Sequence, residues 1–382
     1  METKEEPIRI AQIIGKWLGG GVEAVVMNYY RNIDRTKIQF DFICDEDSTN
    51  IPYEEIEKLG GRVILIPPYQ KVFKYHRELK KVLKDGNYKI VHSHINTLSM
   101  FSLFAAKCAG VPVRIAHSHS TTNKKEWKKN IVKVTLRPFT KLVTTDYMAC
   151  TEHAGRWMFG NKAFDTGKVY ILNNAIDLDK FKYNEKLRKK IRKELKISDS
   201  TVVIGHIGRF VTQKNHTQLI DIFNEYHKNN NNSVLILIGQ GPLMETIKNK
   251  VNSLALDDCV MFLGQKDNVN EYYNAMDLFL FPSLYEGLGM VAVEAQCSGL
   301  PCAVSNQLPS VVKMSNELEF YDLNDFNGWK KFILEFMRDT DSKFRTKKSR
   351  NTSLNIIKNG YSIKEESKKL QKYYLKKIIY KA

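Results

Sequence analysis

Two glutamates eight positions apart, Glu286 and Glu294, stand in the stretch of sequence best suited to chemistry. Glu286 lies in a glycine-flanked loop after an apolar run, and Glu294 lies within a small, apolar helical pattern. Burying a carboxylate there is costly unless a partner meets it, so Glu294 is expected to contact a ligand. Vicinal hydroxyls, as in a ribose, are the usual partners. Between the two carboxylates, Gly287 and Gly289 leave N–H groups of the loop and of the helix start free for anionic or hydroxyl oxygens.

A second motif, Gly208, Arg209 and Lys214, follows a strand predicted at 202–207. At the C-terminal end of a parallel strand, the Arg and the Lys can both point into the crevice where open sheets bind ligands. Two fixed cations suit a diphosphate, the Arg as a planar fork and the Lys as a point charge. Surface charge remains the alternative interpretation for either residue alone.

These motifs need a framework that brings them together. The first half of the chain predicts helices at 22–31, 72–84 and 98–109, and strands at 8–14, 39–44, 62–66, 90–92 and 114–116. The pattern then restarts, with helices at 217–227, 244–254, 269–275 and 291–298, and strands at 202–207, 234–238, 260–263, 277–281 and 301–304. Alternating strands and helices favour βαβ units and parallel sheets. Two α/β halves, divided between Asn174 and Ser200, fit the restart better than one large sheet.

Composition and charge narrow the function classes. With 382 residues, 43% of them hydrophobic, the chain can bury two cores, which excludes disordered, collagen-like and small disulfide-linked proteins. The six cysteines form no Cys-x-x-Cys pair, and no leader-like apolar run follows the N-terminus. The longest mostly apolar stretch, 98–106, is too short to span a membrane. A net charge of +17 favours an anionic partner: nucleic acid, a bilayer surface or a phosphorylated ligand.

The basic residues gather in two segments. Residues 341–382 hold 13 Lys or Arg against 3 Asp or Glu, which favours a solvated helical face. Residues 124–141 hold 7 basic residues and one Glu, with Trp127, Ile131 and Val134 at helical spacing. That pattern is typical of a basic helix on an anionic membrane surface, and a helix packed on its own domain is the alternative. Pro138 is expected to kink or end this helix.

Three further groups have two readings each. The loop Gly19–Gly21 follows the first strand, where it fits either an anion or a plain tight turn. His92 and His94 end one strand and His117 and His119 another, which permits a metal site, although no carboxylate or Cys stands at matching spacing. His117 is expected to point away from His119, on the argument that side chains alternate along a strand. The sequence Asp45-Glu46-Asp47 could bind a metal–diphosphate, but its composition favours a solvated loop.

Taken together, these motifs resemble the retaining glycosyltransferases of family 4 (glycosyltransferase group 1), which have the GT-B architecture. Glu286 and Glu294 match the Glu-x7-Glu motif of that family, and Arg209 with Lys214 match its diphosphate clamp. The segment 173–177 with Phe181 is similar to its entry into the second domain, with Ala175 in place of a glycine. Segments 20–30, 91–94 and 114–120 resemble its exopolysaccharide and capsule branch.

The resemblance implies an α/β fold of two Rossmann-like, doubly wound parallel-sheet domains facing across a cleft. Residues 1–180 would form the acceptor-side domain and 181–364 the donor-binding domain, and a helix at about 365–382 could pack back on the first. The implied catalytic residues are Arg209, Lys214, Glu286 and His119. The implied donor-binding residues are Gly20, Gly21, Gly208, Gly287, Leu288, Gly289, Met290 and Glu294.

The same resemblance implies a reaction and its partners. A sugar would pass with retention from a nucleotide-diphosphate sugar, a UDP-sugar above all, to a lipid-linked saccharide in exopolysaccharide or capsule synthesis. No metal or other cofactor is expected. The enzyme would be cytoplasmic and peripheral on the inner face of the membrane, held through 124–141, with no nucleic-acid partner. Another GT-B nucleotide-sugar enzyme, such as an epimerase, and a basic nucleic-acid-binding protein are the alternatives.

Overall fold

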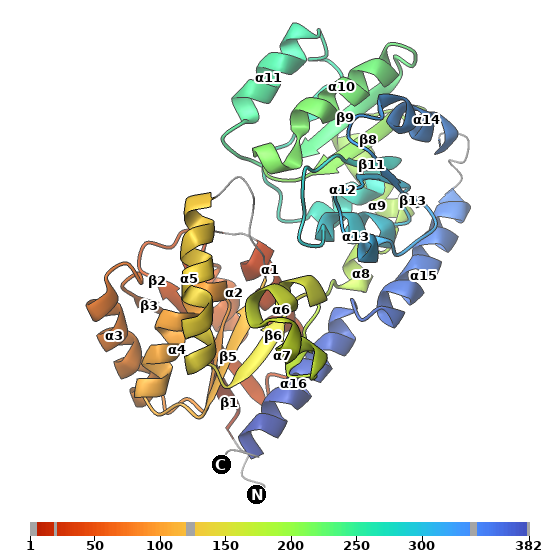
Figure 1. Cartoon of the computed structure of the whole chain (residues 1–382). Helices are drawn as coiled ribbons and strands as arrows, with labels where there is room; N and C mark the ends of the chain where they lie inside the picture. Colours follow the sequence, from red (N-terminus) through yellow and green to blue (C-terminus); the bar gives the residue numbers. More distant parts are fainter. Residues whose placement is uncertain (1–5, 19–20, 120–126, 337–341, 380–382) are drawn as a thin grey trace, which may run out of the picture. The chain divides into compact units, whose positions relative to one another are not determined.

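The computed structural model describes residues 6–18, 21–119, 127–336 and 342–379 (Figure 1). The chain forms two compact units, each with its own sheet. Unit 1 comprises Met1–Ala175 with Gly360–Ala382, and unit 2 comprises Ile176–Asn359. The predicted restart of the strand–helix pattern therefore marks a real change of sheet.

Unit 1 contains a seven-stranded parallel sheet in the order β3-β2-β1-β4-β5-β6-β7. The order reverses between β1 and β4, as in a doubly wound sheet. The strands are β1 (Ile8–Gly15), β2 (Ile38–Asp45), β3 (Arg62–Ile66), β4 (Ile90–Ser93), β5 (Val113–Ser118), β6 (Asp146–Ala149) and β7 (Val169–Ile171).

Helices cover both faces of the unit 1 sheet, so its strands are apolar on both sides. In β1, Ile10 and Ile14 join one core with α1 and α16, whereas Ala11 and Ile13 join a second core with α3, α4 and α6. The helices are α1 (Gly21–Asn32), α2 (Tyr53–Lys58), α3 (Val72–Asp85), α4 (Ser99–Cys108), α5 (Trp127–Val143), α6 (Glu152–Phe159), α7 (Asn161–Asp165) and α16 (Ile363–Ile379), with a 3-10 turn at Asn96–Leu98. Helix α16 comes from the far end of the chain and packs on α1 (Figure 1, blue).

Unit 2 contains a six-stranded parallel sheet in the order β10-β9-β8-β11-β12-β13. Its strands are β8 (Val202–Ile207), β9 (Ser233–Ile238), β10 (Val260–Phe262), β11 (Leu278–Phe281), β12 (Cys302–Ser305) and β13 (Leu318–Tyr321). Its helices are α8 (Leu178–Phe181), α9 (Glu185–Glu194), α10 (His216–His227), α11 (Met244–Ser253), α12 (Val269–Ala275), α13 (Met290–Cys297), α14 (Phe326–Phe336) and α15 (Ser342–Lys358), with 3-10 turns at Thr212–Lys214 and Ser310–Val312.

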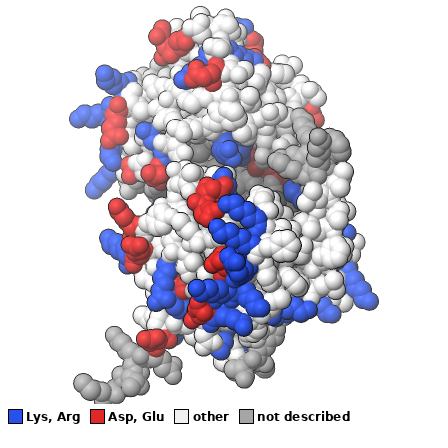
Figure 2. All heavy atoms as spheres, turned by 90° about the vertical axis from the view of Figure 1, so that its left-hand side faces the viewer, with Lys and Arg blue, Asp and Glu red and all other residues white. Residues whose placement is uncertain are grey.

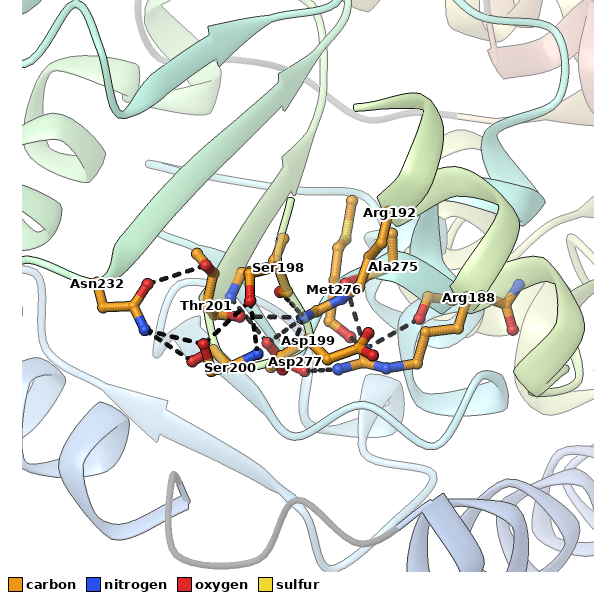
Figure 3. A network of polar contacts seen from close by, with 12 residues as sticks. Arg188, Arg192, Ser198, Asp199, Ser200, Thr201, Asn232, Ala275, Met276 and Asp277 are labelled. Atoms are coloured by element: carbon orange, nitrogen blue, oxygen red, sulfur yellow. Dashed lines mark hydrogen bonds and ion pairs between the residues drawn. The ribbon is translucent and has the colours of Figure 1, made fainter. Parts of the chain in front are cut away.

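A partly buried ion-pair network closes the N-terminal end of the central unit 2 strands (Figure 3). Asp277 precedes β11 and accepts hydrogen bonds from the guanidinium groups of Arg188 and Arg192, both at 2.6 Å. It also accepts from the backbone N–H of Val203 in β8, at 2.8 Å. Burial lowers the pKa of Arg192, whose remaining N–H groups donate to backbone carbonyls, among them that of Ala275. The network anchors α9 to β8 and β11 at one end, which leaves their C-terminal ends for ligands.

Most predicted elements match the structure, and the differences have local causes. The strands at 62–66 and 202–207 and the helix at 269–275 have the predicted bounds. The short strands β6, β7 and β13 escaped prediction because each has only three or four residues, some of them polar or aromatic. Helix α5 continues through Pro138 to Val143, so the proline does not end it. None of the described helices is long and apolar enough to cross a membrane.

Candidate functional site

The predicted donor motifs meet at the point where the strand order of unit 2 reverses. β8 and β11 are neighbours in the sheet, and the chain leaves them in opposite directions, toward β9 and toward β12. At such a reversal the two loops diverge, and they leave a crevice at the carboxyl ends of the strands. Here the two loops are also bonded together. Gln213 accepts from the N–H of Leu284 through its carbonyl at 2.8 Å, and donates from its side chain to the carbonyl of Tyr285 at 2.9 Å.

Lys214 and Glu286 form an ion pair across this junction. The Nζ of Lys214 donates to Oε1 of Glu286 at 2.7 Å, and the two side chains are only 17% and 8% exposed. The same Nζ lies 4.6 Å from the centre of the Phe281 ring, a cation–π contact from the end of β11. The sequence predicted both residues for the site but not their pairing. The pair fixes a cation and a carboxylate side by side, where they could meet a phosphate and a hydroxyl.

Arg209 offers a second cation at the end of β8. Its side chain is exposed, and within the described part of the chain its guanidinium has no ion pair or hydrogen bond. Gly208 precedes it, and a Cβ there would lie 3.1 Å from Nε2 of His206 and 3.3 Å from Cδ of Lys214. The glycine therefore lets the loop pass close behind the lysine, while the arginine remains available to an anion.

The start of α13 supplies backbone donors. Gly289 is its N-cap in the left-handed conformation, with φ of 83°, and no side chain caps the helix. A Cβ there would also lie 3.0 Å from Leu308 and 3.2 Å from Phe281, so this position requires glycine. The first N–H groups of the helix thus lack a side-chain acceptor and carry its positive dipole end. Gly287 is exposed and Met290 is half-buried, whereas Leu288 is buried and can offer only its backbone.

Glu294 lies on α13, half-buried, and is held by a tyrosine. The hydroxyl of Tyr273, in α12, donates to Oε2 of Glu294 at 2.9 Å and lies 3.1 Å from the carbonyl of Val291. Burial raises the pKa of Glu294 to about 7, and the tyrosine hydrogen bond offsets part of that rise. The carboxylate is therefore partnered, but by a neutral group, which leaves its charge uncompensated. Sequence analysis missed Tyr273, because only the packing of α12 against α13 brings it there.

The other predicted site residues belong to unit 1. Gly20 lies outside the described residues. Gly21 is exposed at the first position of α1, and a Cβ there would touch nothing within 4 Å, so the fold does not require glycine. His119 follows β5, and its backbone N–H donates to Oδ1 of Asn96 at 2.8 Å. Burial lowers the pKa of the His119 imidazole to about 3, so that ring is neutral.

One prediction for the histidines is wrong. His117 does not point away from His119: their rings stack with centroids 3.9 Å apart. The physical reason is that residues two apart in a strand share a face, because alternation separates only adjacent residues. His92 and His94 stack in the same way at 4.2 Å, on the adjacent strand β4. Four imidazoles thus form one buried cluster in unit 1.

The sequence offered two candidate metal sites, the histidine cluster and the 45–47 segment, and their surroundings differ. His92, His94 and His117 are buried and could each offer a nitrogen to one ion, with these atoms within 4.8 Å of one another. In the 45–47 segment, Glu46 and Asp47 are instead paired with Lys71 and Lys16, at 2.8 and 2.6 Å. Among the described residues, the three histidines bring possible ligand atoms close together, whereas Asp47 is already paired with a lysine.

Comparisons with known proteins agree with this arrangement. Residues 19–180 match the family model "Glycosyltransferase Family 4", and residues 188–354 match "Glycosyl transferases group 1". EpsF of Bacillus subtilis, assigned to the glycosyltransferases, is 35% identical over 309 residues, 80% of each chain. An Escherichia coli enzyme, UDP-Gal:alpha-D-GlcNAc-diphosphoundecaprenol alpha-1,3-galactosyltransferase, is 26% identical over the full length of both chains.

Solved structures agree on the fold. HepE of Anabaena, crystallised with UDP and glucose, has a TM-score of 0.79 at 16% identity, and the match covers 97% of this chain and 100% of that one. WaaG, a glycosyltransferase of lipopolysaccharide biosynthesis, has a TM-score of 0.72 at 16% identity, over 94% and 98% of the two chains. Two Rossmann-like parallel sheets, two matching family models and a relative of this identity lead to one conclusion: the chain belongs to the GT-B glycosyltransferases, with a family 4 domain followed by a group 1 domain.

Proposed function

We propose that this glycosyltransferase moves a hexose, with retention, from a UDP-sugar to a lipid-linked saccharide in exopolysaccharide or capsule synthesis. The observation that carries the proposal is the junction of two loops in unit 2, which fixes Lys214 and Glu286 2.7 Å apart beside the uncapped start of α13. The named substrates of the Escherichia coli relative, a UDP-galactose donor and a diphosphoundecaprenol-linked acceptor, favour the same classes of donor and acceptor here.

Each unit 2 residue then has a role that its surroundings support. Arg209 and Lys214, with the first N–H groups of α13, neutralise the diphosphate, where charge develops as the bond to the sugar breaks. Glu286, already oriented by its ion pair, accepts from hydroxyls of the donor sugar. Glu294 accepts hydrogen bonds from the ribose hydroxyls, and these bonds stabilise its negative charge in place of a cation. The family resemblance adds His119 as a contact of the donor sugar.

Retention follows in this proposal from a front-side route. The leaving diphosphate accepts the proton of the acceptor hydroxyl, while that hydroxyl attacks the anomeric carbon on the same face. Because Glu286 is committed to its lysine, it is a poor nucleophile for a double displacement. The reaction needs no cofactor in this scheme, because fixed cations and backbone N–H groups stabilise the leaving group.

A donor screen followed by a transfer assay tests the proposal. UDP-glucose, UDP-galactose, UDP-N-acetylglucosamine, GDP-mannose and ADP-glucose are compared by thermal shift, because a ligand of the native state raises its stability. The stabilising donor is then incubated with an undecaprenyl-diphosphate-linked sugar, with and without EDTA. We expect a UDP-sugar to stabilise the protein and to yield an α-linked product in both buffers. Stabilisation by none of the nucleotide sugars, or a β-linked product, would overturn the proposal. Activity that EDTA abolishes and manganese restores would refute metal independence.

The membrane part of the proposal rests on unit 1. Helix α5 carries the predicted stripe, and its described members face solvent: Ile131 is 57% exposed and Val134 is 50% exposed. Trp127 lies in α5, but its side chain is outside the described residues. Leu142, the last residue but one of the helix, is 71% exposed. A helix packed by this face on its own domain would hide these residues, so their exposure favours a surface ligand.

Helix α3 adds a feature that sequence analysis missed. Phe73, in its first turn, is 92% exposed. Exposed Lys74, Arg77, Lys81 and Lys84 follow at helical spacing along one stripe. Figure 2 shows the side of unit 1 on which α3 lies in Figure 1, with Lys and Arg gathered over it and some Asp and Glu among them. We propose that α3 and α5 together hold the enzyme on anionic lipid at the inner face of the membrane, since an aromatic tip and flanking cations suit a headgroup layer.

A further inference from the structure

Six buried or half-buried side chains of unit 1 form one continuous chain of hydrogen bonds. In order along the chain they are His117, His92, Tyr374, Gln12, His94 and His119. The successive distances between bonded atoms are 3.1, 2.6, 3.3, 2.8 and 3.0 Å. The histidines come from the ends of β4 and β5, the glutamine from β1 and the tyrosine from α16. Tyr374 therefore links two pairs of histidines through a helix from the other end of the sequence.

The direction of each bond follows from the amide of Gln12. Its Oε1 can only accept, so His94 donates to it from Nε2. A neutral imidazole has one N–H, so Nδ1 of His94 is bare and accepts from Nε2 of His119. The Nδ1 of His119 is then also bare. This half of the chain ends in an acceptor.

The other half runs in the opposite sense. The Nε2 of Gln12 can only donate, so the Tyr374 hydroxyl accepts from it and donates onward to Nδ1 of His92. His92 then donates from Nε2 to Nδ1 of His117, whose remaining nitrogen, Nε2, carries a proton. This half ends in a donor. All four histidines thus share the Nε2–H tautomer, and turning over the Gln12 amide would reverse every link at once.

The two ends of the chain lie close together and lack partners. Nε2 of His117 and Nδ1 of His119 are buried and have no hydrogen-bond partner among the described residues. Their rings stack with centroids 3.9 Å apart. On each ring, one nitrogen is bonded to the facing histidine and the other is open. Burial lowers the pKa of both imidazoles, so the pair is neutral and suits neither an anion nor a second cation. One donor and one acceptor side by side match a single hydroxyl group, which can accept from one and donate to the other.

We propose that the chain orders the four histidines into one tautomer and so presents a donor–acceptor pair, His117 and His119, to one hydroxyl group of a neutral ligand, with Tyr374 as the positioning residue that couples the two halves. The identity of that ligand as a sugar rests on the proposed function, whereas the shared tautomer does not. A bound hydroxyl would close the chain into a ring of hydrogen bonds.

A metal ion at the same imidazoles is incompatible with this arrangement. Each facing pair of histidines already holds a proton between its nitrogens, at 3.1 Å for His92 with His117 and 3.0 Å for His94 with His119. A metal ligand must present a bare nitrogen to the ion, so metal binding by His92, His94 and His117 would break at least one of these links. The tautomers of the four histidines therefore distinguish a hydroxyl site from a metal site.

Long-range ¹H–¹⁵N correlation spectra of the whole protein, labelled at histidine, test the proposal without any activity assay. Such spectra separate protonated from bare ring nitrogens. We expect His92, His94, His117 and His119 all to be neutral with the proton on Nε2. A mixture of tautomers among them, a charged ring, or signals that shift on addition of Zn²⁺ would overturn the proposal. The wild-type spectrum alone decides this point, even if a variant fails to fold.

Tyr374→Phe tests the coupling, with Tyr30→Phe as its matched control. Tyr30 is also buried in unit 1, and its hydroxyl donates to Gln39 at 2.6 Å, outside the chain. We expect Tyr374→Phe to release His92 and His117 into a mixture of tautomers while His94 and His119 keep theirs, and Tyr30→Phe to change none. Four unchanged tautomers in Tyr374→Phe would overturn the role of Tyr374. Addition of UDP-glucose or UDP-galactose should shift the open nitrogens of His117 and His119 first. A shift at neither, with a donor that thermal shift shows to bind, would refute the hydroxyl site while leaving the proposed function intact.

Discussion

Arg209 differs from the other charged residues of the unit 2 site because nothing in the described structure depends on its charge. Its side chain is exposed and unpaired, so Arg209→Gln should leave the free energy of unfolding unchanged. Loss of a charge-assisted contact to the donor should cost about 1.5–3 kcal/mol, which lowers kcat/KM by roughly 10- to 150-fold. Steady-state kinetics with the stabilising UDP-sugar measure this, with the exposed Arg350 of α15, changed to Gln, as the control. Equal losses in both variants would contradict a specific role for Arg209.

Glu294 differs from Arg209, because its negative charge destabilises the folded protein in the absence of ligand. Burial raises its pKa to about 7 in the folded protein, above the ordinary value of a glutamate. The folded state therefore holds a proton that the unfolded state releases, and stability falls as pH rises from about 4.5 to 7. Glu294→Gln removes that loss, so the variant should gain up to about 3 kcal/mol over wild type at pH 8 and little at pH 5.

Urea unfolding at the two pH values measures this difference for Glu294→Gln. The same variant should lose affinity for the UDP-sugar, since a neutral amide holds vicinal hydroxyls less tightly than a carboxylate. Higher stability with weaker donor binding is typical of a functional group that strains its own fold. A variant less stable than wild type at pH 8 would show that the carboxylate is structural.

At the level of elements, α3 makes the most specific prediction. Lys74, Lys81 and Lys84 lie on one exposed stripe behind Phe73. Each lysine near an anionic surface contributes about 1 kcal/mol, so changing all three to Gln should weaken binding to anionic vesicles on the order of 100-fold. Phe73→Ser should weaken it further. Changing Lys186, Lys189 and Lys193 of α9 to Gln removes the same charge from unit 2 and is the matched control.

Vesicle co-sedimentation at low and high salt measures the membrane binding of the α3 and α9 variants. Wild-type binding should require anionic lipid and weaken with salt, because screening shortens the reach of exposed charges. If the α9 variant loses as much binding as the α3 variant, net charge rather than the α3 stripe holds the protein. If neither loses any, membrane contact through α3 is wrong and α5 alone remains to be tested.

The whole molecule should respond unevenly to acid. Unit 1 buries the imidazoles of His92, His94, His117 and His119, and unit 2 those of His206 and His216; burial lowers the pKa of each, to about 3 for His119 and about 4 for His216. Because unfolded histidine takes up a proton near pH 6.5, this stability is lost as pH falls below 6.5, at about 1.4 kcal/mol per pH unit for each histidine.

Two carboxyls act in the opposite sense. Burial raises the pKa of Asp45 in unit 1 to about 6 and that of Glu294 in unit 2 to about 7, so each stabilises the fold as pH falls. One such group in each unit leaves unit 1 with the larger net uptake of protons on unfolding. Hydrogen exchange at pH 6.5 and pH 4.5 should therefore show unit 1 losing protection before unit 2. Earlier opening of unit 2 would contradict this account of the histidine cluster.

The sequence by itself determined the class of fold and predicted most residues of the candidate site in unit 2. Strands and helices that alternate along the chain require parallel sheets, and Arg209, Lys214, Glu286 and Glu294 follow predicted strands at the edge where such sheets bind ligands. These features are local: a motif next to a strand in the sequence stays next to it in space. The family models then matched the two predicted halves.

Only the tertiary structure decided the contacts between distant segments. Tyr273 reaches Glu294 from another helix, and Tyr374 reaches His92 from 282 positions away in the sequence. The pairing of Lys214 with Glu286 and the single histidine cluster likewise depend on strand order, which periodicity does not reveal. Sequence patterns report which face of its own helix or strand a residue occupies. Which faces then meet depends on how the sheets are wound and packed, and that is a property of the whole fold.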